Sequence, residues 1–413
     1  MVKYTLTLLL SLIVVYSTNA QQKSLDLFIN AGIAKSPLLK DLKNQKRGNA
    51  IDSLRIDASY KPQVTATSSN MYAPTYKDWG YESAITNGGN FSQLISVTKR
   101  LVGKENLHTQ YEAIDLQNQT LEVTGKISEQ DIKKSITAQY ITAYGDQQQY
   151  LFNQEMLKLL SKEESILKTL TEKNVYRQTD YLTFLVTLKQ QELSISQLKI
   201  QLQNDIATLN YLSGINDTSF ITLENPSLEP TIQPEIDNTI FTKQFMLDSL
   251  KLKNSDATID FSYKPKVDLY ADAGHISTFQ LDPYKNFGTS FGVTVTMPIY
   301  DGKQKKMQHD KNAIAQQTIG EYQQYFKSQY TQQIQQLVQQ LQLTDQFIAQ
   351  AKDQLRYSEA LIEANRKLLV SGDARMADFI LAISNYLTSK NTITQTTINR
   401  LQLINQINYW NTK

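Results

Sequence analysis

Few side chains in this sequence stand in a spacing that could perform chemistry. Cysteine is absent, and the three histidines, His108, His275 and His309, are scattered without the spacing of metal ligands. Serine, histidine and aspartate are all present, but no nucleophile elbow, phosphate-cradling glycine loop or H-E-x-x-H motif accompanies them. The sequence therefore predicts a protein that is not an enzyme and holds no metal or cofactor.

Two charged pairs recur at one spacing. Arg177 precedes Asp180 by three residues, and Arg375 precedes Asp378 by three. An acid in the first turn of a helix is stabilised by the helix dipole, so a structural role and a functional role both stay open for the two aspartates. The net charge of the whole chain is only +2, which gives no indication of nucleic-acid binding.

The charged pairs lie within an internal repeat. "NVYRQTDYL" at 174–182 aligns with "GDARMADFI" at 372–380, an offset of 198 positions. Asn174 then stands opposite Gly372, and Asn and Gly are the residues that most readily adopt positive φ. We interpret both positions as tight turns between helices.

A second repeated motif surrounds prolines. "SYKPQV" at 59–64 recurs as "SYKPKV" at 262–267, an offset of 203 positions. Proline lacks the N–H that would continue a helix and biases the preceding residue toward extended backbone, so each motif predicts a junction from helix to strand. The helices that end at these junctions are predicted over about 25–58 and about 239–260. The junction residues are Tyr60, Lys61 and Pro62 in the first half and Tyr263, Lys264 and Pro265 in the second. The tyrosines and lysines suit a membrane–water interface.

Long proline-free blocks follow the strands. The second block carries an apolar stripe that steps by three or four residues from Ile319 to Leu355, the pattern of an amphipathic helix. Each block runs about 70 residues to its turn, or roughly 105 Å of helix. We expect these helices to begin at strand-to-helix junctions, namely Gly103 in the first half and Pro298, Asp301 and Gly302 in the second.

Four short stretches read as strands. Alternation of period two is clear in the second half, from Val267 and from Phe287, and weaker at about 63–73 and 90–99. The chain thus consists of two sequence repeats with the same order of predicted elements. The predicted organisation is a segment 1–20, a first repeat 21–213 with a hairpin at about 62–99 and a turn at about 172–178, a linker 214–238, and a second repeat 239–413 with a hairpin at about 265–299 and a turn at about 370–376.

The first 20 residues predict a cleavable signal peptide. Lys3 precedes a short apolar run from Leu8 to Val15, and "TNA" at 18–20 suits a signal peptidase. The run is shorter than the roughly 18 residues of a spanning helix. If the exported chain crosses a membrane, strands must do so. Four strands cannot close a barrel, for which about eight are the minimum, so a dimer or a trimer would be required.

The repeat resembles the TolC-like outer-membrane efflux protein family over essentially the whole exported chain. The motifs that carry the resemblance are "VSGDARMADFILAISNYL" at 370–387 and "TMPIYDGKQKKM" at 296–307. The first is similar to the family's helix turn, and the second to its strand-to-helix junction. The first half departs from both patterns, because it has "KRLVGK" at the junction and Asn174 in the turn.

The resemblance implies a mainly α fold with a small β part. It implies tandem-duplicated helical hairpins that form a periplasmic α-barrel, and a homotrimer whose four strands per chain form a 12-stranded transmembrane barrel in the cell outer membrane. It also implies a passive exit duct of a tripartite efflux or type I secretion system, linked by a periplasmic adaptor (membrane fusion protein) to an inner-membrane pump.

Roles for the turn residues follow from the resemblance. Asp180 and Asp378 are the candidate gate charges, with Arg177 and Arg375 beside them, and Asn174 and Gly372 are candidates for adaptor docking. A second hypothesis of another class stays open, a periplasmic coiled-coil scaffold whose small sheet does not enter a membrane.

Overall fold

The computed structural model describes residues 22–77, 79–86, 88–217, 219–231, 236–278, 285–373 and 375–411. The predicted signal peptide, residues 1–20, lies outside this part of the chain, as do most of the second hairpin's loop and part of the linker. Among the described residues, no helix combines the length and apolar character needed to cross a bilayer.

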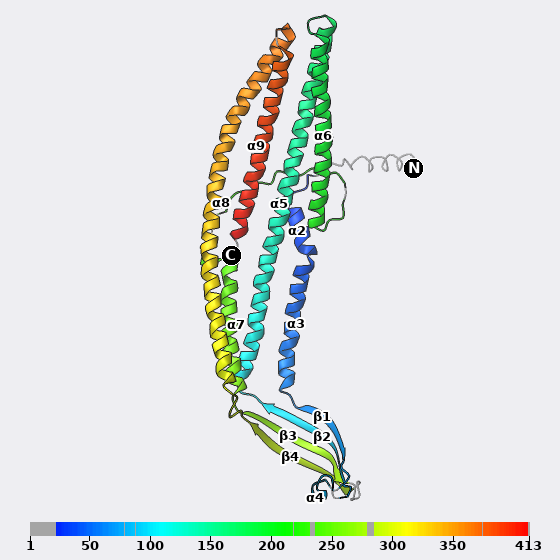
Figure 1. Cartoon of the computed structure of the whole chain (residues 1–413), viewed down its shortest axis with the longest axis vertical. Helices are drawn as coiled ribbons and strands as arrows, with labels where there is room; N and C mark the ends of the chain where they lie inside the picture. Colours follow the sequence, from blue (N-terminus) through cyan, green and yellow to red (C-terminus); the bar gives the residue numbers. More distant parts are fainter. Residues whose placement is uncertain are drawn as a thin grey trace, which may run out of the picture. The chain divides into compact units, whose positions relative to one another are not determined.

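The elements alternate between helices and strands in the predicted order (Figure 1). The described elements are α2 (Leu25–Lys35), α3 (Pro37–Ser59), β1 (Gln63–Tyr72), α4 (Ser83–Thr86), β2 (Gly89–Leu101), α5 (Lys104–Glu172), α6 (Gln178–Leu212), the 3-10 turn Ile236–Asn238, α7 (Ile240–Ser262), β3 (Lys266–Thr278), β4 (Phe287–Thr296), α8 (Gln304–Ser371) and α9 (Met376–Trp410). The prediction of a mainly α fold with long helical hairpins and four strands is confirmed.

The first helix differs from its prediction. The sequence suggests one helix over about 25–58, whereas the structure has α2 and α3 separated by Ser36. Pro37 has no N–H to continue α2, and Ser36 takes ψ 119°, outside the helical region. Pro37 is then the first residue of α3, the helical position at which proline is tolerated best.

The chain divides into two compact units that cut across the predicted repeats. Of the described residues, one unit contains those up to Leu39, those from Lys126 to Ile240 and those from Lys327 onward, and the other contains those from Lys40 to Gly125 and from Phe241 to Phe326. Each unit therefore draws segments from both halves of the sequence. The first contains both helix turns, and the second contains the whole sheet.

In the unit with the turns, one core cluster fastens the linker and the start of α2 to α5. Phe28 and Tyr140 are both fully buried and meet edge to face, with ring centroids 5.8 Å apart. The Tyr140 hydroxyl lies 2.9 Å from the Lys23 carbonyl oxygen and 2.8 Å from the Glu224 carbonyl oxygen. Burial raises the pKa of this phenol, so it stays a donor at physiological pH.

We expect Tyr140→Phe to lower the free energy of unfolding by about 1–3 kcal/mol, because buried carbonyls lose their hydroxyl donor. Thermal unfolding followed by circular dichroism measures the change. Tyr144→Phe on the same helix is the control, since the described residues offer the Tyr144 hydroxyl no hydrogen bond. Equal effects of the two substitutions would contradict this anchoring role for Tyr140.

Candidate functional site

Both helix turns use the left-handed backbone that the repeat alignment predicts. Asn174 has φ 59° and Gly372 has φ 84°. The Val175 N–H donates to the Leu170 carbonyl across the first turn, and the Asp373 N–H donates to the Leu368 carbonyl across the second. These matching bonds satisfy carbonyls at the ends of α5 and α8. Each of the two helices therefore ends in a C-terminal cap of the same type.

The two turns also contact each other. The Tyr176 hydroxyl donates to the Leu369 carbonyl oxygen over 3.2 Å, and a Cβ added to Gly372 would lie 2.8 Å from the Val175 Cγ1 atom. Below the turns, the rings of Phe184 and Phe379 stack 6.2 Å apart. The structure therefore brings residues near positions 174 and 372, some 200 positions apart in sequence, into one packed end of the unit.

The predicted charged pairs lie at the starts of α6 and α9. The Asp180 carboxylate accepts the Arg177 backbone N–H over 3.3 Å, which caps the start of α6. Arg375 Nε lies 3.9 Å from an Asp378 carboxylate oxygen, and both of these side chains are largely exposed. Within the described chain, neither aspartate forms an ion pair across the two turns. Their helix-start role is thus visible, and a gating role stays a prediction.

A buried ion pair near the turns was missed from the sequence. Glu163 on α5 is fully buried, and Arg366 Nε on α8 lies 2.8 Å from one of its carboxylate oxygens. Glu163 follows Leu160 by three residues and precedes Leu167 by four, so it occupies a position in the apolar stripe of α5. An acid at such a position is the sequence signal that could have identified the pair.

We expect Gly372→Ala to be more destabilising than Asn174→Gly, the substitution at the matching position of the first turn. A Cβ at φ 84° is strained and would also press on Val175, which together should cost about 1–2 kcal/mol. The matched variant Asn174→Gly should be neutral or slightly stabilising, because Asn174 already has positive φ. Thermal unfolding of both variants measures the difference, and equal losses would contradict it.

The buried ion pair predicts an asymmetry between its two partners. Arg366→Gln leaves the Glu163 carboxylate buried without its counter-charge, which typically costs about 3–5 kcal/mol for a fully buried pair. Glu163→Gln should cost less, because Arg366 is one-third exposed and also lies near Glu363. In the Glu163→Gln background, Arg366→Gln should lower the free energy of unfolding by less than it does in the unsubstituted protein. Chemical unfolding of the three variants tests this order, and an equal loss in both single variants would refute it.

The helix-to-strand junctions lie where the proline motifs predict. β1 begins directly after Pro62 and β3 directly after Pro265. The Tyr60 hydroxyl accepts a hydrogen bond from the Gln110 side chain over 2.5 Å. The Asp301 carboxylate, which interacts with the Tyr263 hydroxyl, raises the pKa of Tyr263. Each tyrosine thus fastens its junction to the chain beyond the hairpin. Of the junction lysines, Lys61 is exposed, and Lys264 Nζ lies 4.2 Å from the Phe261 ring centroid.

The two strand-to-helix junctions differ. After Pro298, Asp301 accepts the backbone N–H groups of Lys303 and Lys305 over 2.8 and 2.7 Å, which caps α8 and lowers the Asp301 pKa. Gly302 turns the chain with φ 66°. At the first junction Gly103 precedes α5, and at the repeat offset of 198 this glycine stands in the place of Asp301. Because Asp301 has no acidic counterpart at the first junction, α5 lacks the side-chain cap that α8 has.

The sheet is antiparallel throughout, in the order β1-β2-β3-β4 (Figure 1). Residues opposite each other in such a sheet share a face. One cross-strand row contains Val64, Val97, Ala271 and Phe291, and the neighbouring row on the other face contains Thr65, Ser96, Asp272 and Ser290.

The two faces of the sheet have opposite character. The first face is mainly apolar and exposed, with Lys99 as an exposed charge, and its large exposed apolar side chains are Val64, Tyr72, Ile95, Val97, Leu101, Leu269, Phe287, Phe291, Val293 and Val295. The second face is rich in hydroxyl groups and glycine, and its charged residues are Arg100, Lys266, Asp268 and Asp272. Arg100 Nε lies 2.9 Å from Asp268. Neither β1 nor β4 has a strand beside its outer edge in the described chain.

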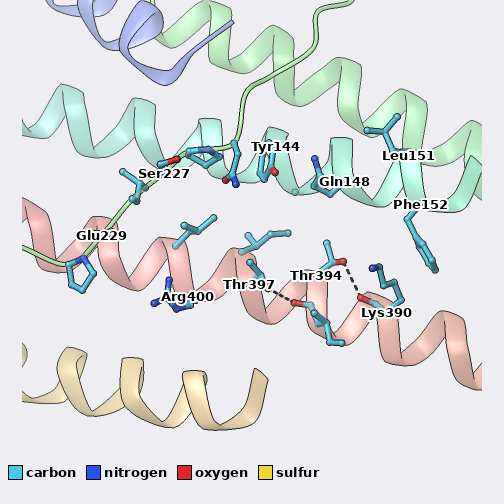
Figure 2. Close-up of a pocket in the computed structure, with 18 of the residues that line it drawn as sticks. Tyr144, Gln148, Leu151, Phe152, Ser227, Glu229, Lys390, Thr394, Thr397 and Arg400 are labelled. Atoms are coloured by element: carbon cyan, nitrogen blue, oxygen red, sulfur yellow. Dashed lines mark hydrogen bonds between the residues drawn. The ribbon is translucent and has the colours of Figure 1, made fainter. Parts of the chain in front are cut away.

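A groove in the turn-containing unit offers little for specific binding (Figure 2). It measures about 730 Å³ and is lined by α5, α9 and linker residues that include Ser227 and Glu229. On α9, the Thr394 and Thr397 hydroxyls donate to the carbonyls of Lys390 and Ile393 in their own helix. These hydroxyls are thereby already satisfied, and the described residues contain no cluster of metal-ligating side chains.

The described chain thus consists of two long helical hairpins and a four-stranded sheet that has two unlike faces and two open edges. No family model and no curated protein matches this sequence. Several solved structures, in contrast, are similar to this chain. The outer membrane protein VceC of Vibrio cholerae is 13% identical with TM-score 0.73, over 94% of this chain and 96% of that one. The Neisseria gonorrhoeae MtrE outer membrane channel, in its open state, is 11% identical with TM-score 0.71, over 94% and 89%.

A third similar structure is the Campylobacter jejuni CmeC outer membrane channel, 11% identical with TM-score 0.70, over 94% of this chain and 86% of that one. At these identities the similarity establishes the fold. The chain therefore has the TolC-like fold that the two sequence motifs indicate.

Proposed function

We propose that this protein is the outer-membrane channel subunit of an export system. The observation that carries the proposal is the four-stranded sheet, which has one apolar face, one polar face and two open edges. The apolar face is exposed to the outside of the chain instead of covering a core, and such a face needs an apolar solvent. Alternating strands of about ten residues are what a membrane-spanning barrel requires.

The open edges point to assembly. In a lipid bilayer the backbone groups of β1 and β4 need partners, and the edge of another copy is the natural one. Four strands per chain fall short of the minimum of about eight, so several copies must contribute. The TolC-like fold favours three copies and a 12-stranded barrel, with the apolar face toward lipid and the hydroxyl-rich face toward the lumen.

The remaining parts of the chain fit a passive, non-enzymatic duct. The exported chain would place its long helices in the periplasm, below a barrel in the cell outer membrane. The packed turns around Asn174 and Gly372 would then meet a periplasmic adaptor that connects to an inner-membrane pump. Asp180 and Asp378, beside Arg177 and Arg375, stand at this end and are the proposed gate charges.

Two neighbouring residues of β4 provide the sharpest test. Val293 belongs to the apolar face and is paired with Leu269, whereas Thr294 belongs to the polar face and is paired with Asp268. We expect Val293→Lys to prevent assembly in the outer membrane, because a lysine facing lipid costs about 2–4 kcal/mol per copy at the bilayer midplane. Thr294→Lys should assemble normally and change only conductance.

The measurements are heat-modifiable oligomers in outer-membrane fractions and single-channel conductance in planar bilayers. Recovery of the unsubstituted chain as a soluble periplasmic monomer would reject the channel and favour the coiled-coil scaffold. Equal tolerance of lysine at positions 293 and 294 would reject the assignment of the two faces.

A further inference from the structure

The two halves of the chain use the same contact beside each hairpin. In the first half, the Tyr111 hydroxyl on α5 donates to the Asp57 carboxylate on α3. In the second half, the imidazole of His309 on α8 contacts the Asp260 carboxylate on α7, with Nε2 3.3 Å from an oxygen. Asp57 and Asp260 differ by 203 positions and Tyr111 and His309 by 198, which are the two offsets of the repeat. The contacts are therefore counterparts.

The chemistry of the two contacts differs. A phenol has one proton to donate, and Asp57 accepts it. An imidazole has two nitrogens, and the second one, Nδ1 of His309, lies 2.9 Å from a carboxylate oxygen of Asp256. The first-half counterpart of Asp256 is Ser53, so the second carboxylate and the histidine occur together only in the second half.

Both nitrogens of His309 thus face carboxylates. A neutral imidazole donates through one nitrogen and presents a lone pair at the other, whereas the imidazolium donates through both. Of the side chains in this cluster, histidine is the type that changes charge between pH 5 and 8. Asp256 and Asp260 both receive a hydrogen bond from His309 only when each of its two ring nitrogens carries a proton.

The surrounding groups hold the two carboxylates in place. Lys305 Nζ lies 2.9 Å from the Asp260 carboxylate, and the Asn312 amide donates to Asp256 over 2.8 Å. Lys305 and His309 lower the pKa of Asp260, which therefore stays ionised across the range in which an imidazole titrates. On the side of the hairpin, Lys305 Nζ lies 5.7 Å from the centroid of the Tyr263 ring.

We propose that His309 is a pH-sensitive clamp between α7 and α8 beside the second hairpin. Protonation adds a second charge-assisted bond and tightens the contact, while deprotonation releases one carboxylate. The counterpart clamp of Tyr111 and Asp57 is insensitive to pH over the same range, because the bond to Asp57 raises the pKa of Tyr111 further above 10. The proposal concerns the chain itself and does not depend on the channel function.

Hydrogen–deuterium exchange of the full-length protein tests the clamp. Rates at pH 5.5 and pH 8 are corrected for the intrinsic pH dependence of exchange. We expect the last turns of α7 to be protected about two- to fivefold more at pH 5.5, as suits a partly exposed ion pair. The last turns of α3 should show equal protection at the two pH values.

The repeat supplies the matched variants. His309→Tyr places the first-half residue in the second half and should abolish the pH response of α7. Asp256→Ser, which introduces the counterpart Ser53 residue, should reduce the response while leaving the Asp260 contact, and His108→Gln should leave it unchanged. Equal corrected protection at both pH values in the unsubstituted protein would overturn the proposal, as would a full response in His309→Tyr or in Asp256→Ser.

Discussion

The backbone groups along the outer edges of β1 and β4 impose the constraint on which the rest of the structure depends. Within the described chain, β2 and β3 are each paired on both sides, whereas β1 and β4 are each paired on one. Side chains add a second constraint, because one face of the sheet is apolar and exposed. Neither water nor the chain's own core satisfies both. The proposed function meets both constraints, because it supplies further copies at the edges and an apolar medium at one face, which is why that proposal rests on the sheet and not on a pocket.

The helix turns meet a different constraint. The chain must reverse its direction between two long helices within a few residues. Both turns use positive φ and a matching backbone bond, although one uses Asn174 and the other Gly372. Packing between the turns then limits what each position tolerates. Gly372 faces Val175 at close range, and the Glu163–Arg366 ion pair links α5 to α8 close by. This end of the unit is thus held by close packing of the two turns and by an ion pair whose acid is fully buried.

The duplicated halves have also diverged in how they hold their hairpins. The second half caps α8 with Asp301 and surrounds His309 with charged partners. The first half has no acid at the junction, and the counterpart of Lys305 is Leu107. Beside the second hairpin, charged partners surround His309 and Asp301 caps α8, whereas beside the first hairpin the matching positions rely on hydrogen bonds of Tyr60 and Tyr111. This asymmetry places the charge-sensitive contacts beside the second hairpin.

Much of the fold was determined by the sequence alone, since helix periodicity, strand alternation and proline position are local properties of the chain. They sufficed for the element order, the turns at Asn174 and Gly372 and the strand starts after Pro62 and Pro265. Pro37 is also a local signal, because it marks the point at which the first predicted helix divides into α2 and α3. The helical pattern on both sides of Pro37 nevertheless favours a single helix in the prediction. Contacts between distant segments were decided only by the tertiary structure. The ion pair of Glu163 with Arg366, the anchoring of Tyr140 and the two carboxylates around His309 join residues from different helices, and their identity depends on helix rotation and register. A local pattern does not determine these quantities, because they are set by how side chains from several elements fill a common space.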